Sequence, residues 1–203
     1  MPSNQPKTLH RPYGGVSADD RRDERRRRLL DAGLELFGTK GIAATTIANV
    51  CDEAGLTKRY FYESFATIDD LAGAVFADIT DRLVEQVAPA IAAGAGVDPR
   101  PLLTVYLGAV LGDPRLARFL GAESRTPALA ERQAAFGSRA VAVWFSSAPG
   151  ADDSAARLRA HAFAGAIDEV TLAWTKGELD LSVEEVIDEL VDIFHRITAA
   201  KTP

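Results

Sequence analysis

The sequence predicts an all-α protein with about nine helices. Apolar side chains recur at spacings of three and four residues along most of the chain, as one face of a helix requires. Hardly any segment alternates apolar and polar residues with period two, so no strand is predicted. Glycines, prolines and hydroxyl side chains divide the pattern into segments of helical length. The 203 residues, 47% hydrophobic and 26% charged, are ordinary for a globular protein.

The N-terminal elements come first. Residues 1–18 are rich in proline and glycine and lack apolar periodicity, so we expect a disordered arm. A helix is expected from residue 19, with Leu30, Leu34 and Phe37 on one face and Gly41 ending it. We expect residues 19–66 to form one domain and residues 67–203 a second, larger one.

The later elements follow the same pattern. Helices are expected over about 67–93, from the loop at Pro101 through Leu111, and over 113–121, 127–146, 154–176 and 182–199, with a loop at 147–154. Thr67 with Asp70, and Ser182 with Glu185, have the spacing of a capping box, in which each side chain satisfies a free backbone donor of the first turn.

The segment 45–65, TTIANVCDEAGLTKRYFYESF, predicts two short helices joined by a tight turn. Gly55 allows a left-handed turn, and Thr57 is a good N-cap for the second helix. Leu56 and Phe61 have hydrophobic-staple spacing, which fixes the entry angle of that helix. This arrangement is the helix-turn-helix geometry. The apolar face of the first helix is formed by Ile47, Val50, Cys51 and Ala54.

The second short helix carries the residues that suggest a function. Phe61 and Phe65 are four residues apart and should face the core. Lys58, Arg59 and Tyr62 then point outward, with Tyr60 at the boundary, where this motif meets base edges and phosphates. Thr46, at the start of the preceding helix, has a hydroxyl and free N–H groups for a phosphate. The alternative is an ordinary helical hairpin with a solvated basic tip.

The charge distribution agrees with a DNA-facing N-terminal region. The net charge is −6, but residues 1–65 hold 11 Lys/Arg against 9 Asp/Glu, and the remainder holds 12 against 20. No apolar run could span a bilayer and no secretory signal is apparent, so we expect a cytoplasmic protein with no membrane partner. Cys51 is the only cysteine. The sequence shows no metal-ligand cluster, phosphate loop or nucleophile elbow, so we expect no metal, no cofactor and no enzyme activity.

Residues 25–71 resemble the DNA-binding domain of the tetracycline-repressor (TetR) family of bacterial regulators. The likeness lies in LLDAGLELFGTKG, in ATTIANVCDEAGLTKRYFYESF and in the aromatic pair Tyr62 and Phe65. It implies a cytoplasmic homodimer on a palindromic operator in double-stranded DNA, usually released by a small-molecule effector. It also implies phosphate contacts by Thr46 and Tyr62, and base reading by Lys58, Arg59 and Tyr60. We expect Thr57, at the start of the second helix, to belong to the same DNA-binding set.

Two positions depart from the family pattern. Ile68 stands where a lysine is common, so one phosphate contact should be missing and the salt dependence flatter by about one unit of slope. Arg59 stands where a small residue is common, which suggests a contact particular to this protein.

The C-terminal part predicts an interface and a pocket. The penultimate helix has two apolar stripes. One of them, with the apolar stripe of the last helix, is suited to a four-helix interface between two protomers. The alternative is a monomer. The interface residues expected are Leu158, Ala162, Gly165, Ala173, Val183, Ile187, Leu190 and Phe194. The pocket residues expected are Phe76, Tyr106, Phe119, Phe136, Trp144, His161, Phe163 and Ile167, although each could equally be plain core.

From the sequence we expect a ligand-responsive regulator that acts as a repressor, and two other classes remain open. A helical enzyme that carries a helix-turn-helix would need convergent titratable groups, and we find none in the C-terminal part. A DNA-binding interaction protein without a small-molecule ligand would lack an enclosed, partly polar cavity within residues 72–175.

Overall fold

The computed structural model describes residues 17–93, 98–145 and 153–198, with side chains omitted over 140–145. Within these ranges every regular element is helical, and the all-α prediction is confirmed. The α-helices are α1 (Ala18–Lys40), α2 (Ile47–Ala54), α3 (Lys58–Tyr62), α4 (Ile68–Ala92), α5 (Arg100–Gly112), α6 (Pro114–Gly121), α7 (Ala130–Phe145), α8 (Ser154–Thr175) and α9 (Val183–Thr198), with a 3-10 turn η1 at Glu123–Arg125. Residues 1–16 of the arm expected at 1–18, and residues 147–152 of the loop expected at 147–154, lie outside the described residues.

The helices begin where the sequence supplies caps. Ser17 caps α1, Thr67 caps α4 and Ser182 precedes α9, and each is paired with the carboxylate three residues later in a capping box. Two of these are the boxes that the sequence predicts. The cap at Ser17 places the start of α1 at Ala18, so the boundary of the expected arm is about two residues too late.

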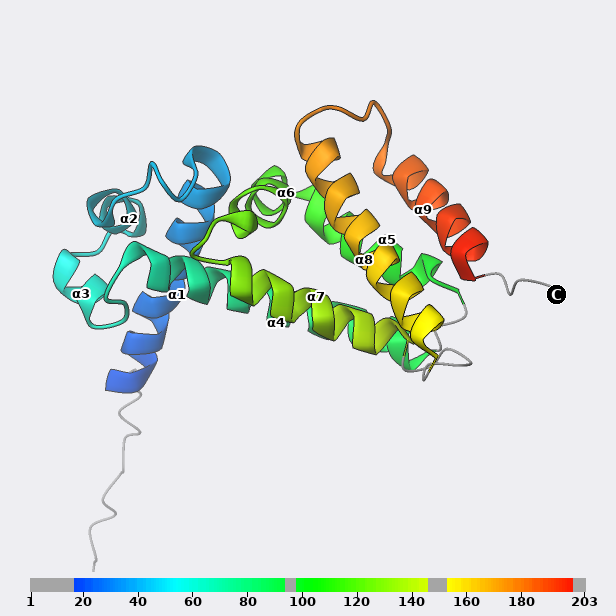
Figure 1. Ribbon diagram of the computed structural model, residues 1–203. Helices are drawn as coiled ribbons and strands as arrows, with labels where there is room; N and C mark the ends of the chain where they lie inside the picture. The colour runs from blue at the N-terminus through cyan, green and yellow to red at the C-terminus, as the bar shows by residue number, and fades with distance from the viewer. Residues whose placement is uncertain (1–16, 94–97, 146–152, 199–203) are drawn as a thin grey trace, which may run out of the picture.

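Helices α1 to α3 gather at one end of the molecule and α8 and α9 lie at the other, as Figure 1 shows. The long helix α4 runs between the two ends and packs against α1, α5 and α7. Helix α6 packs against both α1 and α8, so it links the two ends. One continuous core runs from Leu29 in α1 to Phe194 in α9.

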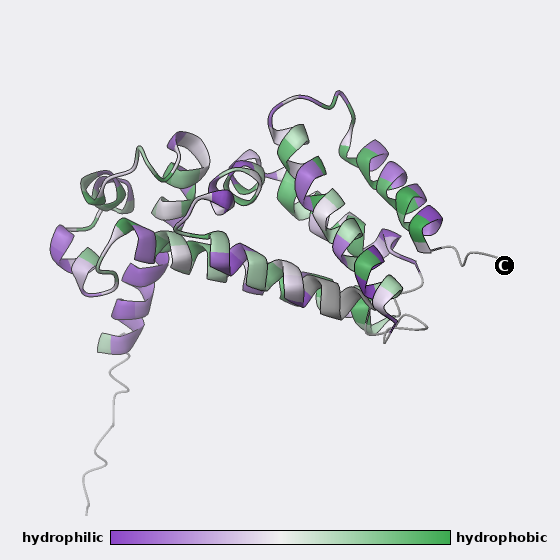
Figure 2. Cartoon of the chain, viewed as in Figure 1, coloured by the Kyte–Doolittle hydropathy of each residue, from purple (hydrophilic) through white to green (hydrophobic). Residues whose placement is uncertain are grey.

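The buried face of α1 is wider than the sequence predicts. Leu29, Leu36 and Phe37 are fully or almost fully buried, whereas Leu30 and Leu34 are only partly buried at its edge. The reason is that α1 contacts α2, α4 and α6 on different sides. Its first turns are hydrophilic (Figure 2), whereas α3 combines hydrophilic residues with the buried Phe61.

Candidate nucleic-acid interface

Helices α2 and α3 are joined by the turn that the sequence predicts. Gly55 has the left-handed conformation, with φ 61° and ψ 39°, and the Leu56 N–H donates to the Cys51 carbonyl at 2.8 Å. A side chain at position 55 would be strained, and its Cβ would stand 2.8 Å from Nη2 of Arg28. Thr57 takes the N-cap position of α3 but makes no capping hydrogen bond with its side chain. The hydroxyl of Thr57 is thus left on the exposed side of the turn.

Helix α3 is anchored on one side and open on the other. Phe61 is fully buried and packs against Phe65, with ring centroids 5.8 Å apart. Lys58 and Arg59 are exposed, and 60% of Tyr62 is accessible. The structure therefore brings the expected base-reading and phosphate-contacting side chains to one outward surface, with half-buried Tyr60 at its boundary.

Thr46 has a structural task as well as an exposed position. It is the N-cap of α2, and its hydroxyl accepts from the Asn49 N–H at 3.2 Å and donates to the Asn49 side-chain oxygen at 2.8 Å. The backbone N–H of Thr46 also donates to that oxygen. The N–H groups left over for a phosphate are those of the first turn of α2 itself.

The arginine run 25–28 packs against the helix-turn-helix, which the sequence did not predict. The Arg25 guanidinium lies 4.5 Å from the centre of the Tyr60 ring, and Arg26 lies 4.6 Å from that of Phe65. Arg28 donates to the carbonyls of Ala54 and Gly55 at the end of α2. The partners lie 26 to 39 residues downstream, so local periodicity could not reveal them.

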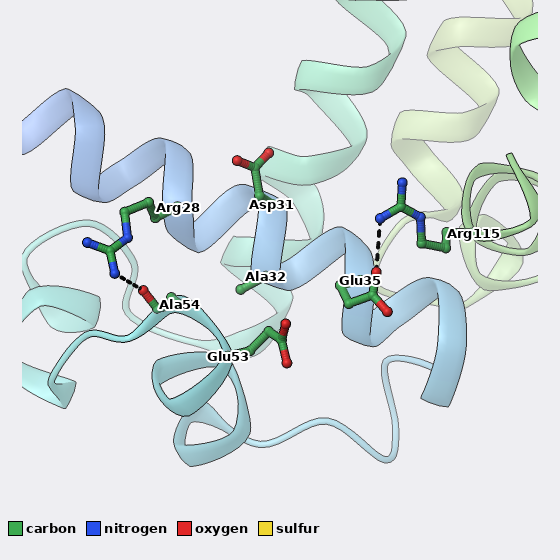
Figure 3. Close-up of a pocket in the computed structure, with 7 residues that line it drawn as sticks. All are labelled: Arg28, Asp31, Ala32, Glu35, Glu53, Ala54 and Arg115. Carbon is green, nitrogen blue, oxygen red and sulfur yellow. Dashed lines mark hydrogen bonds and ion pairs between the residues drawn. The ribbon is translucent and has the colours of Figure 1, made fainter.

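Arg28 also borders a polar crevice of about 370 Å³ between α1, α2 and α6 (Figure 3). At its other end Arg115 donates to Glu35 at 2.9 Å and to Asp113 at 2.7 Å. The hydrogen bonds from Arg115 hold the pKa of Asp113 below its usual value. The two arginines of this crevice are thus already bound to groups of the chain.

The C-terminal end of α1 packs against α6 and the 3-10 turn η1. Glu123 accepts from the Ile42 N–H at 2.9 Å, and Arg118 donates to the Thr39 carbonyl at 3.0 Å. Phe37 stacks on Phe119 with ring centroids 6.0 Å apart. Phe119 therefore belongs to the contact between the two ends of the molecule, although the sequence suggested a pocket residue.

The other expected pocket residues differ in burial, and some lie in the interior while others do not. Phe76 and Phe163 are buried, as is Ile167, and Phe136 meets Phe76 edge-on at 6.2 Å. His161 is exposed on the outer side of α8, so the structure removes it from the interior set. Trp144 has a side chain outside the described residues.

Polar side chains from α5, α7 and α8 also lie close together, and no local pattern in the sequence predicts this. Burial raises the pKa of Asp168 on α8 and that of half-buried Tyr106 on α5 above their ordinary values. Gln133 on α7 donates to the Asp168 carboxylate at 3.4 Å. Three helices thus contribute polar side chains to one place in the larger domain.

The apolar stripes of α8 and α9 differ in exposure. Leu158 is 70% exposed, Ala162 and Gly165 are also exposed, and Ala173 is half-buried. Gly165 has open space where a side chain would stand. Within the described chain, Leu158, Ala162 and Gly165 therefore face solvent.

The apolar stripe of α9 instead packs inside its own chain. The sequence predicted that this stripe would face a second protomer, and the structure corrects that prediction. Ile187, Leu190 and Phe194 are at most 5% exposed because α9 packs on α5 and α8, and Phe194 lies 5.2 Å from Phe163, ring to ring. Val183 is half-buried against the same core. These four residues therefore hold α9 to its own domain.

Helices α1 to α3, with the outward surface of α3, form a helix-turn-helix of the kind that binds DNA. Residues 29–75 match the family of bacterial regulatory proteins known as the tetR family. The chain is 37% identical over 83 residues to the HTH-type transcriptional activator FasR of Mycolicibacterium smegmatis, a match that covers 40% of this chain and 38% of that protein. Residues 29–75 thus resemble the DNA-binding domain of the TetR family.

Solved structures extend the likeness to the larger domain. A TetR-like transcriptional regulator from Rhodococcus sp. RHA1 matches with a TM-score of 0.67 at 25% identity, over 87% of this chain and 97% of that one. FadR from Bacillus subtilis in complex with stearoyl-CoA matches with a TM-score of 0.71 at 16% identity, over 86% and 98%. At such low identity FadR shows a shared fold alone.

Two features are absent from the described residues. None of their helices has the length and apolar character that crossing a membrane requires. No group of three or more histidine, cysteine, aspartate or glutamate side chains there is arranged to hold a metal ion.

Proposed function

We propose that the protein is a homodimeric repressor that binds a palindromic operator and releases it when a small molecule binds the larger domain. The observation that carries this proposal is the outward surface of α3, where Lys58, Arg59 and Tyr62 are exposed while Phe61 fixes the helix from below. Arginine and lysine can donate to guanine O6 and N7, and a tyrosine hydroxyl suits a phosphate oxygen. DNA binding places this activity in the bacterial cytoplasm.

The DNA-binding unit comprises residues 19–66 in this proposal, and residues 67–203 bind the effector and the second protomer. Thr46 and Thr57 flank the reading surface from the starts of α2 and α3. Tyr60 contributes to it from a half-buried position beneath Arg25. In a two-fold dimer the two α3 helices would meet successive major-groove faces, about 34–36 Å apart or a multiple of that distance.

Substitution of Arg59 by alanine tests the reading surface. The operator is first selected from genomic fragments with the purified protein, and binding is then measured by fluorescence anisotropy. We expect Arg59→Ala to weaken binding by about 1–3 kcal/mol and to relax the base preference at one position of each half-site. The matched control is Arg82→Ala, because Arg82 is also an exposed arginine paired with a carboxylate four residues away, Asp78, but lies on α4. Equal losses in the two variants would refute the role of Arg59.

The effector site in this proposal lies between α4, α5, α7 and α8, where Phe76 and Phe136 supply apolar surface and Asp168 a polar end. The stearoyl-CoA bound by the FadR relative makes long-chain acyl thioesters the first compounds to test. Release of the selected operator by one compound of a metabolite panel would support the effector, and the substitution Phe136→Ala should weaken that release. A DNA-binding protein without an effector is the second candidate, and a panel that releases nothing would favour it.

A further inference from the structure

One carboxylate lies at the end of the helix that we propose reads DNA. Glu63 follows α3 directly and stands between two guanidinium groups. Its carboxylate lies 3.3 Å from Nε of Arg59 and 3.7 Å from Nη2 of Arg25. The inference drawn from this arrangement rests on the proposed function, because it concerns how Arg59 would read a base.

A carboxylate at this place weakens general attraction to DNA. It faces the same polyanion as Lys58 and Arg59 and subtracts charge from the surface that must neutralise phosphates. Its side chain is 37% exposed, so burial does not hide the charge. A negative group that opposes general binding can still serve DNA recognition if it improves the choice among DNA sequences.

The contact with Arg59 has a geometry that suits base reading. Glu63 accepts from Nε of Arg59, which leaves the two terminal amino groups of the guanidinium for other acceptors. Those two groups form the fork that can donate to O6 and N7 of guanine together. The Arg59 side chain is 85% exposed, so that fork is directed to solvent in the free protein.

Glu63 is in turn held from α1. The Arg25 side chain is only 24% exposed, because its guanidinium lies over the Tyr60 ring at 4.5 Å while it pairs with Glu63. The carboxylate is therefore tied to the long first helix as well as to its own short one. Such a network orients a side chain better than an isolated exposed pair does.

We infer that Glu63 is a positioning residue that aims Arg59 at a guanine in each half-site. The Glu63 carboxylate lowers the affinity for DNA of any sequence and raises the selectivity for that base. Arg25 anchors it, so the first helix contributes to sequence reading without touching a base.

The test compares selectivity with total affinity. Wild-type protein and the variants Glu63→Ala and Glu63→Gln are each used to select from a random duplex DNA library, and affinities for the selected operator and its single-base variants follow by anisotropy. The matched control is Asp78→Ala, which removes the carboxylate of an i,i+4 arginine pair on α4, away from α3. Helix content is checked by circular dichroism for every variant.

We expect Glu63→Ala to lower the preference for guanine at one position by about two- to fivefold per half-site, and by about four- to 25-fold on a full palindrome. Its affinity for unrelated duplexes should rise at low salt, because a negative charge is lost. Partial unfolding cannot produce these opposite changes. Glutamine keeps an oxygen that accepts from Nε, so Glu63→Gln should lie between wild type and Glu63→Ala. Asp78→Ala should match wild type.

An unchanged guanine preference in Glu63→Ala would overturn the inference and leave the proposed function intact. A wild-type protein that selects no motif would instead overturn the proposed function. If Glu63→Ala loses binding to every duplex, Glu63→Gln decides: a reduced guanine preference without loss of total affinity supports the inference, and an unchanged preference refutes it.

Discussion

The contact between α1 and α6 leads to a prediction about stability, and the structure gives the magnitude of the expected change in unfolding free energy. Gly38 of α1 lies directly against the backbone of Arg115. An added Cβ at position 38 would stand 2.7 Å from the Arg115 Cα and 2.8 Å from its carbonyl oxygen. A real Cβ contact is ordinary only beyond 3.4 Å, so the two helices would have to separate by several tenths of an ångström. The atoms that must move are backbone, which no rotamer change can relieve.

The substitution Gly38→Ala combines two opposing effects. Overpacking of a tight contact costs about 1–3 kcal/mol, while alanine gains about 0.5–1 kcal/mol over glycine inside a helix. We expect a net loss of about 1–2 kcal/mol in the free energy of unfolding. The matched control is Gly108→Ala in α5, where an added Cβ meets nothing within 4 Å. That variant should gain about 0.5–1 kcal/mol from helix propensity alone.

Urea unfolding followed by circular dichroism measures both variants. Protomer concentration must be kept equal, because dimerisation adds to apparent stability. The midpoint should fall for Gly38→Ala and rise for Gly108→Ala. If both variants become more stable than wild type, the contact between α1 and α6 is not tight, and the reasoning from backbone distances is wrong.

Three other predictions concern single contacts. Arg28→Met removes hydrogen bonds from a charged group to the end of α2 and should lower the free energy of unfolding by about 1–3 kcal/mol; an unchanged urea midpoint would exclude this role. The pKa of Asp113 is lowered in the fold, so the carboxylate stabilises the fold above its ordinary pKa of 3.8, and this contribution is lost as pH falls through the folded-state pKa. Asp113→Asn should therefore make the melting temperature depend less on pH in the acid range. An unaltered dependence would contradict the pairing with Arg115. Leu158→Glu should separate the proposed dimer and leave the helix content unchanged, whereas Leu190→Ala should cost about 2–5 kcal/mol of folding free energy. Analytical ultracentrifugation measures the first effect and urea unfolding the second. A Leu158→Glu variant that still sediments as a dimer would contradict the proposed interface.

Much of the fold could be predicted because its signals are local. Helix starts depend on caps within three residues, and the turn at Gly55 depends on one residue that tolerates positive φ. The burial of Phe61 and the exposure of Arg59 follow from helical spacing alone. The surface that we propose reads DNA could therefore be predicted from the sequence, and so could the resemblance to the TetR family.

The tertiary structure decided which partner each predicted face meets. Leu190 and Leu158 both lie on apolar stripes, but packing against α5 buries the first and leaves the second open. The roles of Arg25, Glu63 and Asp168 depend on groups from distant parts of the chain. The sequence by itself determined where helices begin, which residues share a face and that α3 presents its basic side chains outward. Only the three-dimensional fold determined what lies opposite each face, because periodicity records the direction of a side chain and not the neighbour that it meets.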